Sequence, residues 1–365
     1  AMYDKYFKRI GACAGEHECP GGQGKNSAHY LMSWYYAWGG AMESAQYPWA
    51  WRIGGSSAHQ GYQNPMAAYA LSETEALTPE SPTAAEDWAT SMDRQLEFVQ
   101  WLQSAEGGIA GGATNSWAGR YAEPPEGAAT FYGMYYDWQP VWHDPPSNNW
   151  FGFQVWNMER IAQLYSTTGD ERAGAILDAW VPWVLENTEV GADGEFAVPS
   201  DLEWSGSPDD WTGAPTGNPD LHVEVTAHGQ DVGVAAGLAK TLMHYAAGSG
   251  DAAARTAAEG LLDALLEHRD DLGIAVEEAR SDYARFDDEV YIPQGWSGAM
   301  ANGDPVEPGS TFTSIRSFYR DDPQWPKVEA YLEDPDGPAP AFTYHRFWSQ
   351  TEIATAFAVH DELFG

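Results

Sequence analysis

"AAEDWATSMDRQLEFVQWLQSAEGGIAGGATNSWAGRY", residues 84–121, joins a long amphipathic segment to a glycine-rich turn. Large apolar side chains recur along it every three or four residues, at Trp88, Met92, Leu96, Val99 and Leu102. This spacing predicts one face of a helix over 84–105, with Thr83 as its cap. Glycines follow at 107, 108, 111 and 112. Because glycine adopts conformations closed to other residues, we expect a tight turn beside something that approaches the backbone closely.

The rest of the chain alternates helical patterns with long loops. Further helices are expected over 26–38, 149–168, 171–187, 229–247, 252–270 and 349–364. The loops, rich in Gly, Pro, Trp and Asp and too long for simple connectors, are 39–64, 106–148, 190–226 and 281–324. The strand–helix alternation of a doubly wound sheet is absent. We therefore predict an all-α protein, an α/α barrel, with one domain over 1–365 and no separate second domain.

The charge restricts the class of partner. The 365 residues carry a formal net charge of −36 and have a pI of about 4.3. A field of this sign repels nucleic acid and anionic polymers but does not oppose a neutral substrate. The simplest interpretation is a solubilising surface. No apolar run is long enough for a membrane span, so neither nucleic acid nor membrane is an expected partner.

Two features near the N-terminus concern processing. Cys13 and Cys19 flank "AGEHE", and a disulfide or free thiols are favoured over a metal site that would include His17. The opening "AMYDKYFKRIG" has no basic-then-apolar signal segment, and a helical pattern is already under way at Met2. We interpret the chain as a piece of a longer protein.

The loops share one composition, in which aromatic residues alternate with Asp, Asn, Gln, His and Arg. Examples are "WYYAW" at 34–38, "HQGYQNP" at 59–65, "WHDPPSNNWFGFQVW" at 142–156, "EWSGSPDDW" at 203–211 and "YHRFW" at 344–348. A sugar has an apolar C–H face and a rim of hydroxyls, which aromatic rings and amide or carboxylate groups recognise respectively. Any single tryptophan is more often core than platform. The repeated mixture predicts a carbohydrate ligand.

Glycoside cleavage usually requires two carboxyl groups, one to protonate the leaving oxygen and one to activate water or attack carbon. Candidates in loops or at helix starts are Glu106, Asp144, Glu203, Asp209, Asp210, Asp231, Asp282 and Asp304. The sequence cannot pair them, and for each alone a cap, a turn or a solvated charge is the more common role. Asp144 could bind a hard cation, although a plain Asp-Pro turn is favoured on the residues alone. Signatures of P-loop, Rossmann, serine-hydrolase and H-E-x-x-H enzymes are absent.

These loops resemble glycoside hydrolase family 48 over nearly the whole chain and in order. The motifs that carry the resemblance are "SAHYLMSWYYAWGG", "WAWRIG", "HQGYQNPMAAY", "RQLEFVQWLQSAEGGIAGGATNSWAGRY", "FYGM", "DPPSNNWFGFQVWNMER", "DLEWSGSPDDW", "SDYARF", "ANGD" and "YHRFW". The resemblance implies an (α/α)6 barrel and a secreted, extracellular bacterial cellulase. Such an enzyme threads a glucan chain through a tunnel from the reducing end and inverts the anomeric carbon. It releases mainly cellobiose and holds a structural calcium ion. Some animal relatives are linked to chitin.

The resemblance also assigns residues. Aromatics that match the substrate path are Trp34, Tyr35, Trp49, Trp51, Tyr62, Trp150, Trp156, Trp211 and Trp348, with Trp142 where the family usually has Tyr. Trp117 is expected to face sugar or to support the tunnel wall together with Asn115. Asp231 in "GQDVG" matches an acidic residue near the cleavage centre, and Asp144 matches a calcium ligand, which reverses the turn interpretation. We expect cellulose or cello-oligosaccharides as partners and a monomer when the protein is intact.

One departure from the family is decisive. The proposed general acid, a glutamate, and the proposed base, an aspartate, belong to an N-terminal part that nothing here matches, as do further calcium ligands. The chain therefore resembles the C-terminal portion of the catalytic module, with an incomplete barrel and calcium site. Two alternatives are a non-catalytic glucan-binding or structural remnant and a chitin-active enzyme of the same fold. Because an open barrel exposes apolar helix faces, at about 25 cal/mol per Å², we predict marginal stability or aggregation of the isolated chain.

Overall fold

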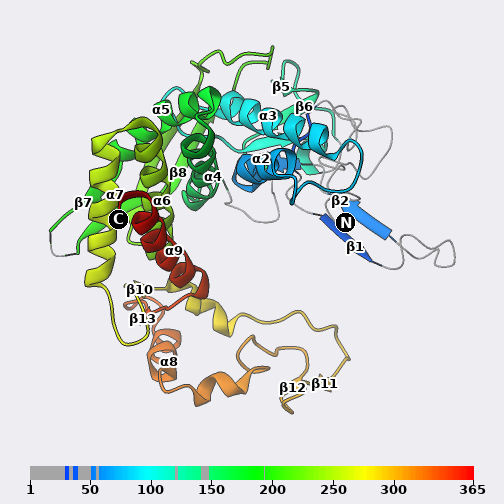
Figure 1. The fold of residues 1–365 in the computed structure, drawn as a ribbon. Helices are drawn as coiled ribbons and strands as arrows, with labels where there is room; N and C mark the ends of the chain where they lie inside the picture. Colours follow the sequence, from blue (N-terminus) through cyan, green and yellow to red (C-terminus); the bar gives the residue numbers. More distant parts are fainter. Residues whose placement is uncertain are drawn as a thin grey trace. The chain divides into compact units, whose positions relative to one another are not determined.

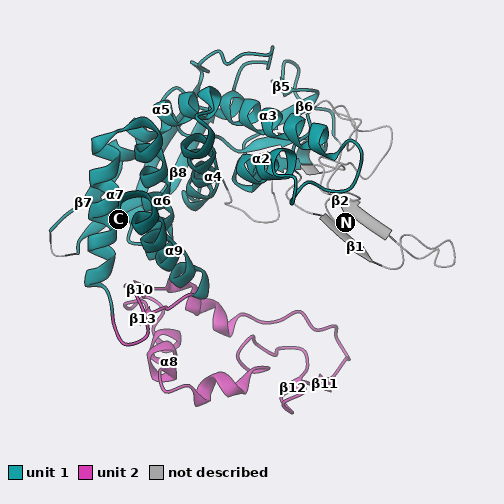
Figure 2. Cartoon of the chain, in the orientation of Figure 1, with its two compact units in different colours: residues 1–269, 347–365 teal, residues 270–346 magenta. Residues whose placement is uncertain are grey.

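The computed structural model describes residues 29–32, 36–39, 51–54, 57–119, 122–140, 148–192 and 194–365. They form two compact units (Figure 2): unit 1 comprises residues 1–269 and 347–365, and unit 2 comprises residues 270–346. The prediction of one module over the whole chain stays a prediction. In the part of the chain that the structure describes, no helix has the length and apolar character needed to span a membrane.

Unit 1 is built around paired helices (Figure 1). These are α2 (Pro65–Glu73), α3 (Ala84–Leu102), α4 (Gly152–Thr168), α5 (Glu171–Glu186), α6 (Val232–Ser249), α7 (Ala252–Glu267) and α9 (Phe347–Phe364). Helix α6 is buried along most of its length and packs against α4, α7 and α9. A helix that is apolar on all sides is typical of a core position, so α6 is the centre of this helical layer.

The same Gly-Asp dipeptide connects two pairs of helices, α4 to α5 and α6 to α7. Gly169 ends α4 and Gly250 ends α6, each in the left-handed conformation that glycine adopts at no steric cost. Asp170 then caps α5 by accepting hydrogen bonds from the amides of Arg172 and Ala173. Asp251 caps α7 in the same way through the Ala254 amide. These stops and caps explain why the expected boundaries of the helices near 169 and 250 are confirmed.

The structure is helix-rich, as predicted, but it is not all-α, because unit 1 also contains sheets. One has the strand order β3-β4-β6-β5, from β3 (Ser57–His59), β4 (Gly112–Thr114), β5 (Thr130–Phe131) and β6 (Met134–Asp137). A second has the order β7-β8-β9, from β7 (Glu189–Val190), β8 (Phe196–Gly206) and β9 (Leu221–Gly229). The expected loop 190–226 is therefore largely an antiparallel hairpin. Alternate side chains of "LHVEV" at its second strand are buried, the pattern of a half-buried strand.

The prediction of a helix over 26–38 is also wrong at its C-terminal end. Residues Tyr36–Gly39 form strand β1, which pairs antiparallel with β2 (Trp51–Gly54). Aromatic and β-branched residues favour strands, and the aromatic run "YAWG" pairs with "WRIG". Short 3-10 turns complete unit 1, at η3 (Gln60–Tyr62) and η4 (Trp117–Gly119).

The glycine-rich turn lies against other parts of the backbone. A Cβ at Gly107, whose φ is +119°, would overlap the carbonyl of Ala179. A Cβ at Gly112 would overlap the carbonyl oxygen of Ala58 on the neighbouring strand. The close approach expected from the sequence is therefore confirmed, and protein backbone is what approaches. A side chain at either position would displace main chain rather than a flexible group.

Unit 2 consists of short elements around a small aromatic core. Its elements are β10 (Glu277–Ala279), η5 (Ser281–Asp287), β11 (Gly298–Ala299), β12 (Pro305–Val306), η6 (Ser317–Asp321), α8 (Trp325–Glu333) and β13 (Ala341–Thr343). Strand β10 pairs with β13, and β11 with β12. Trp325, Val328 and Phe342 form the buried core. Most of the expected loop 281–324 is turns and 3-10 helix.

Candidate functional site

Three of the predicted substrate-path residues lie together around one phenylalanine. The ring centroid of Phe153 on α4 lies 5.6 Å from Tyr62, 5.4 Å from Trp150 and 5.2 Å from Trp156. Phe153 is buried, whereas the other three side chains are half-buried. We call these four residues the unit 1 aromatic cluster. Its three outer rings keep apolar surface available for a flat, uncharged ligand.

The start of α4 is fixed by strand β8. The Phe151 amide donates to the Ser200 carbonyl at 3.0 Å, and the Leu202 amide donates to the Asn149 carbonyl at 2.7 Å. The Asn149 side chain returns a hydrogen bond to the Leu202 carbonyl. Trp150 itself bridges to Asp201 of β8. Because both neighbours of Trp150 are hydrogen-bonded to β8, its backbone is held in place, and its ring packs against Phe153 and Trp156.

Buried polar side chains from "HQGYQNP" accompany the cluster. The His59 ring lies 4.6 Å from Phe153, and its Nδ1 accepts from the Gly61 amide. Burial lowers the pKa of His59 to about 3, so the ring is neutral at ordinary pH and its proton is on Nε2. The Gln60 Oε1 accepts from the Asn157 side-chain amide at 3.1 Å. The segment therefore presents neutral hydrogen-bonding groups.

Three atoms of this set have no hydrogen-bond partner within the described residues. They are Nε2 of His59, Nε2 of Gln60 and Oδ1 of Asn157. Buried polar atoms are normally paired, because leaving one unpaired costs about 1–3 kcal/mol. Two donors and one acceptor are thus buried among residues next to the aromatic cluster; their chemical type matches the hydroxyls of a neutral ligand, and all three side chains are 0% exposed.

Charged side chains connect the segment 59–65 to α4, and α4 to helices α6 and α9. Arg160 of α4 donates from Nη1 to the carbonyls of Gly61 and Gln63, which fixes the loop to the helix. Lys240 of α6 forms ion pairs with Glu159 of α4 at 2.9 Å and Glu352 of α9 at 2.6 Å. Burial favours a lower pKa for Lys240, but the two carboxylates outweigh it and leave the pKa raised. The lysine therefore stays charged and joins three helices.

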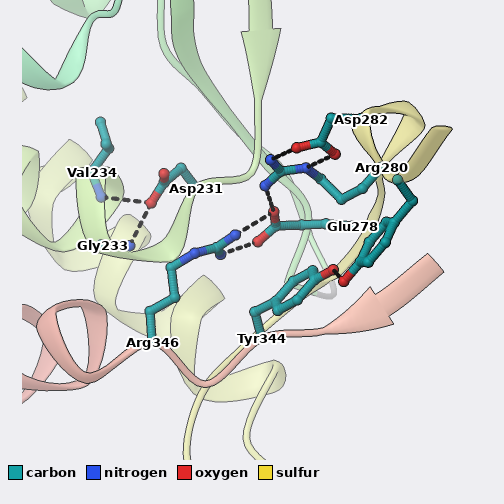
Figure 3. Close-up of polar contacts among 9 residues, drawn as sticks. Asp231, Gly233, Val234, Glu278, Arg280, Asp282, Tyr344 and Arg346 are labelled. Carbon is teal, nitrogen blue, oxygen red and sulfur yellow. Dashed lines mark hydrogen bonds and ion pairs between the residues drawn. The ribbon is translucent and has the colours of Figure 1, made fainter. Parts of the chain in front are cut away.

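Asp231 and Trp348 both contact Gly233 at the start of α6. Oδ1 of Asp231 accepts from the amides of Gly233 and Val234, at 3.0 and 3.1 Å (Figure 3). The Trp348 ring packs on Gly233, where a Cβ would overlap it. Asp231 is thus a helix cap, the structural role that is common for such an aspartate. Its part near the cleavage centre stays a prediction.

The remaining described tryptophans lie in other ring contacts. Trp117 lies 6.5 Å from Tyr135, and Trp211 lies 5.8 Å from Phe131. No ring contact between described residues joins either one to the unit 1 aromatic cluster. Trp34, Tyr35, Trp49, Trp142 and Asp144 lie outside the described residues, as do Cys13 and Cys19, and only the backbone of Trp51 is described, in β2.

Most carboxylate candidates of unit 1 are engaged in holding the fold. Glu106 contacts His222 at 2.7 Å and accepts from the Val223 amide. Burial raises its pKa, but these hydrogen bonds outweigh burial and lower it, which makes Glu106 a poor proton donor. Asp210 accepts from the amide and hydroxyl of Thr130. Asp209 makes its contact through the main chain, where its carbonyl accepts from the Trp101 indole, and Glu203 is exposed on β8, so these two carboxylates are not engaged in the same way.

The two candidates of unit 2 are likewise structural. Asp282 pairs with Arg280 at 2.7 Å, beside the Arg346–Glu278 pair (Figure 3). Asp304 accepts from the amide and hydroxyl of Ser317. Among the described residues no group of three or more His, Cys, Asp or Glu side chains could hold a metal ion. The calcium expectation, which centres on Asp144, stays a prediction.

Sequence reasoning missed three polar or aromatic members of this region: Gln60, Phe153 and Asn157. It also did not single out Asp137 of β6. Asp137, at the end of β6, has a pKa that burial raises, and its Oδ1 accepts from the Gln139 amide. The first three belong to motifs that were recognised, but their partners are distant in sequence. Only the tyrosine and tryptophans of those motifs stand out by residue type.

Half-buried aromatic rings beside a few hydrogen-bonding groups are typical of small-molecule binding sites. A family model described as glycosyl hydrolase family 48 matches residues 1–364. The chain belongs to this family.

Relatives agree with that membership. Exoglucanase B of Cellulomonas fimi is 56% identical over 100% of this chain and 34% of the relative. Exoglucanase-2 of Thermoclostridium stercorarium is 54% identical over 100% of this chain and 39% of the relative. A cellulose 1,4-beta-cellobiosidase (reducing end) of Acetivibrio thermocellus is 50% identical over 98% of this chain and 48% of the relative. The chain therefore spans less than half the length of these relatives.

Proposed function

We propose that this chain forms the C-terminal portion of a cellulase catalytic module, an extracellular enzyme that hydrolyses β-1,4-glucosidic bonds. The observation that carries the proposal is the unit 1 aromatic cluster beside the unpartnered atoms of His59, Gln60 and Asn157. Family membership and the relatives named exoglucanase and cellobiosidase support it. In the intact protein the paired helices would be part of an (α/α)6 barrel.

The chain's own residues would bind and orient the glucan. Tyr62, Trp150 and Trp156 would stack on the C–H faces of successive sugar rings. The imidazole of His59 and the amides of Gln60 and Asn157, which are fully buried, would support these rings and would hydrogen-bond hydroxyls only after the neighbouring side chains move.

The bond-breaking groups would come from the part of the module that precedes this chain. In an inverting enzyme an acid protonates the leaving oxygen and a base activates water across a gap of about 6.5–9.5 Å. The engagement of Glu106, Asp231, Asp282 and Asp304 in caps and ion pairs supports an origin elsewhere. Processive action from the reducing end, release of cellobiose and a structural calcium ion at Asp144 belong to the same proposal.

Hydrolysis of phosphoric-acid-swollen cellulose tests the proposal. The chain is assayed alone and in a longer protein in which the N-terminal part of the family module precedes it. Cellobiose from the longer protein only, with the α-anomer formed first, would support the assignment. Cellobiose from the chain alone would overturn the upstream origin of the acid and base, and would return Asp137 and Asp231 to consideration as catalysts.

A second candidate, a non-catalytic glucan-binding protein, is favoured by the same engaged carboxylates. It predicts that the longer protein binds cellotetraose without hydrolysing it. A chitin-active enzyme predicts stronger binding of chitotetraose than of cellotetraose. Isothermal titration of both oligosaccharides, with Trp150→Ala as a variant of the cluster, separates these outcomes from the cellulase proposal.

A further inference from the structure

Unit 2 contains a cavity of about 270 Å³, and the described residues that line it all belong to unit 2. Its walls come from η5, η6, α8 and β13. Aromatic side chains dominate the lining: Tyr283, Phe286, Tyr319, Trp325, Phe342 and Tyr344. None of these residues belongs to the unit 1 aromatic cluster, and none was predicted as a site residue from the sequence.

The rings form a continuous wall. Tyr283 lies 5.0 Å from Phe286 and 5.3 Å from Phe342, and Phe286 lies 5.7 Å from Tyr319. Phe342 is 8% exposed, whereas Tyr319 is 36% exposed. The inner rings are therefore fixed by packing, and Tyr319 offers a ring at the entrance. Such preorganised aromatic surface binds a ligand with little loss of side-chain freedom.

Polar groups accompany the rings at one side of the cavity. Asp322, Gln324 and Thr343 contribute to the lining. The Asp322 carboxylate is held by a hydrogen bond of 2.8 Å from the Gln324 amide. The indole N–H of Trp325, a residue that is 8% exposed, has no acceptor among the described residues. A ligand with hydroxyl groups in this cavity would lie against Trp325 and meet the Asp322 carboxylate and the Gln324 side chain.

The charges near the rings narrow the choice of ligand. Lys327 lies 5.0 Å from the centroid of Phe342, and the Arg346 guanidinium lies 4.8 Å from that of Tyr344. These rings already interact with cations of the protein, so a cationic ligand gains little. Asp322 and the net charge of −36 oppose an anionic ligand. The class of ligand that these charges favour is a neutral ring with an apolar face and hydroxyl groups along its edge.

We propose that this cavity binds one pyranose ring at the end of a neutral β-1,4-linked glucan chain. The choice of a neutral pyranose follows from the cavity, and the choice of β-1,4-glucan rests on the proposed function. A cavity of about 270 Å³ is just below the usual range of small-molecule sites, which fits a single sugar ring rather than a long oligosaccharide. Unit 2 would thus provide a second saccharide contact for the protein.

Titration of the ¹⁵N-labelled full chain with cellobiose tests the inference, because each tryptophan indole N–H gives its own NMR signal. The Trp325 signal is assigned by backbone connectivity and by its loss in Trp325→Phe. We expect a progressive, saturable shift of this signal, with maltose and glucose giving weaker binding. No shift of the Trp325 signal with any of the three sugars would overturn the inference.

Two variants make the test specific. Tyr319→Ala removes the ring at the entrance and should weaken the cellobiose affinity measured at Trp325 by about three- to tenfold. Tyr291→Ala removes an aromatic ring of unit 2 that is 91% exposed and does not line the cavity, so the affinity should stay unchanged. Equal weakening by both variants would contradict a site at this cavity.

The same titration separates this inference from the proposed function. Cello-oligosaccharide binding to the unit 1 aromatic cluster is reported by the indole signals of Trp150 and Trp156. Shifts confined to these two signals would overturn the unit 2 site and leave the proposed function standing. A Trp325 shift that persists in Trp150→Ala would support the unit 2 site even if the cellulase proposal fails. Equal affinity for maltose and cellobiose would overturn the choice of β-1,4-glucan.

Discussion

Units 1 and 2 bury their aromatic and charged residues to different degrees. In unit 1, Lys240 is 6% exposed and contacts two carboxylates around a buried central helix. In unit 2, the Arg280 and Asp282 side chains are 42% and 56% exposed, and short strands surround a small aromatic core. Unit 1 therefore buries its ion pairs among long helices, whereas unit 2 has a small core and keeps its ion pair partly in water.

The largest expected effect tests how far unit 1 depends on close backbone packing. Gly112→Val places a Cβ against the Ala58 carbonyl and should lower the free energy of unfolding by about 3 kcal/mol or more. Urea unfolding followed by circular dichroism measures this loss.

Gly229→Val is the matched control, because Gly229 also lies in a strand and its Cβ would meet only Ser200 at an ordinary 3.7 Å. Similar losses for both variants would mean that strand glycines are needed for a reason other than the contact with Ala58.

The second largest effect is the difference in stability cost between breaking a buried ion pair in unit 1 and breaking an exposed one in unit 2. Lys240→Met leaves the Glu159 and Glu352 carboxylates facing each other and should cost about 2 kcal/mol. Arg280→Met in unit 2 should cost less than about 1 kcal/mol, because its ion pair lies in water. Thermal unfolding of both variants at low and high salt checks the difference. Equal costs would remove charge burial as a distinction between the units.

The smallest effect concerns pH. Burial lowers the pKa of His59 to about 3, below its unfolded value of about 6.5, so the unfolded state binds the proton more readily. Stability from this group is therefore lost as the pH falls from about 6.5 toward 3. Between pH 6 and 5 His59→Gln should reduce the loss by about 1 kcal/mol.

The contribution of Asp282 to the stability of unit 2 should be lost at a lower pH than that of His59 in unit 1. Asp282, whose pKa is lowered by its hydrogen bond with Arg280, loses its contribution only as the pH falls below about 4. Urea unfolding at pH 7, 6 and 5 measures the slope for the wild type and His59→Gln. An unchanged slope in the variant would show that His59 does not titrate as its burial requires.

The sequence predicted the local features of the fold well. The face of α3, its start at Ala84 and the Gly169–Asp170 boundary depend on neighbouring residues, and the structure confirms them. Helix α2 was missed because Asn64 and Pro65 were assigned to a loop motif, although Asn64 caps that helix by accepting from the Ala67 amide. The β8–β9 hairpin was missed because its many polar and turn residues conceal the alternation of its second strand.

The site was predicted by residue type but not by partnership. Tyr62, Trp150 and Trp156 were named, yet only the fold shows that Phe153 joins them. Gln60 and Asn157 lie far apart in the sequence, and their contact depends on how η3 packs on α4. Isolated carboxylates could not be separated into caps and catalysts, since an aspartate before a helix looks the same in either role.

The position of α9 in the sequence has a consequence for biosynthesis. Helix α9 packs against α6, but the ribosome makes it only after the whole of unit 2. Until then the nascent chain carries α6 without one of its covering helices and Lys240 without Glu352. Unit 1 is therefore completed after translation of residues 270–346, and a chaperone that shields apolar helices during this interval would raise the yield of folded protein.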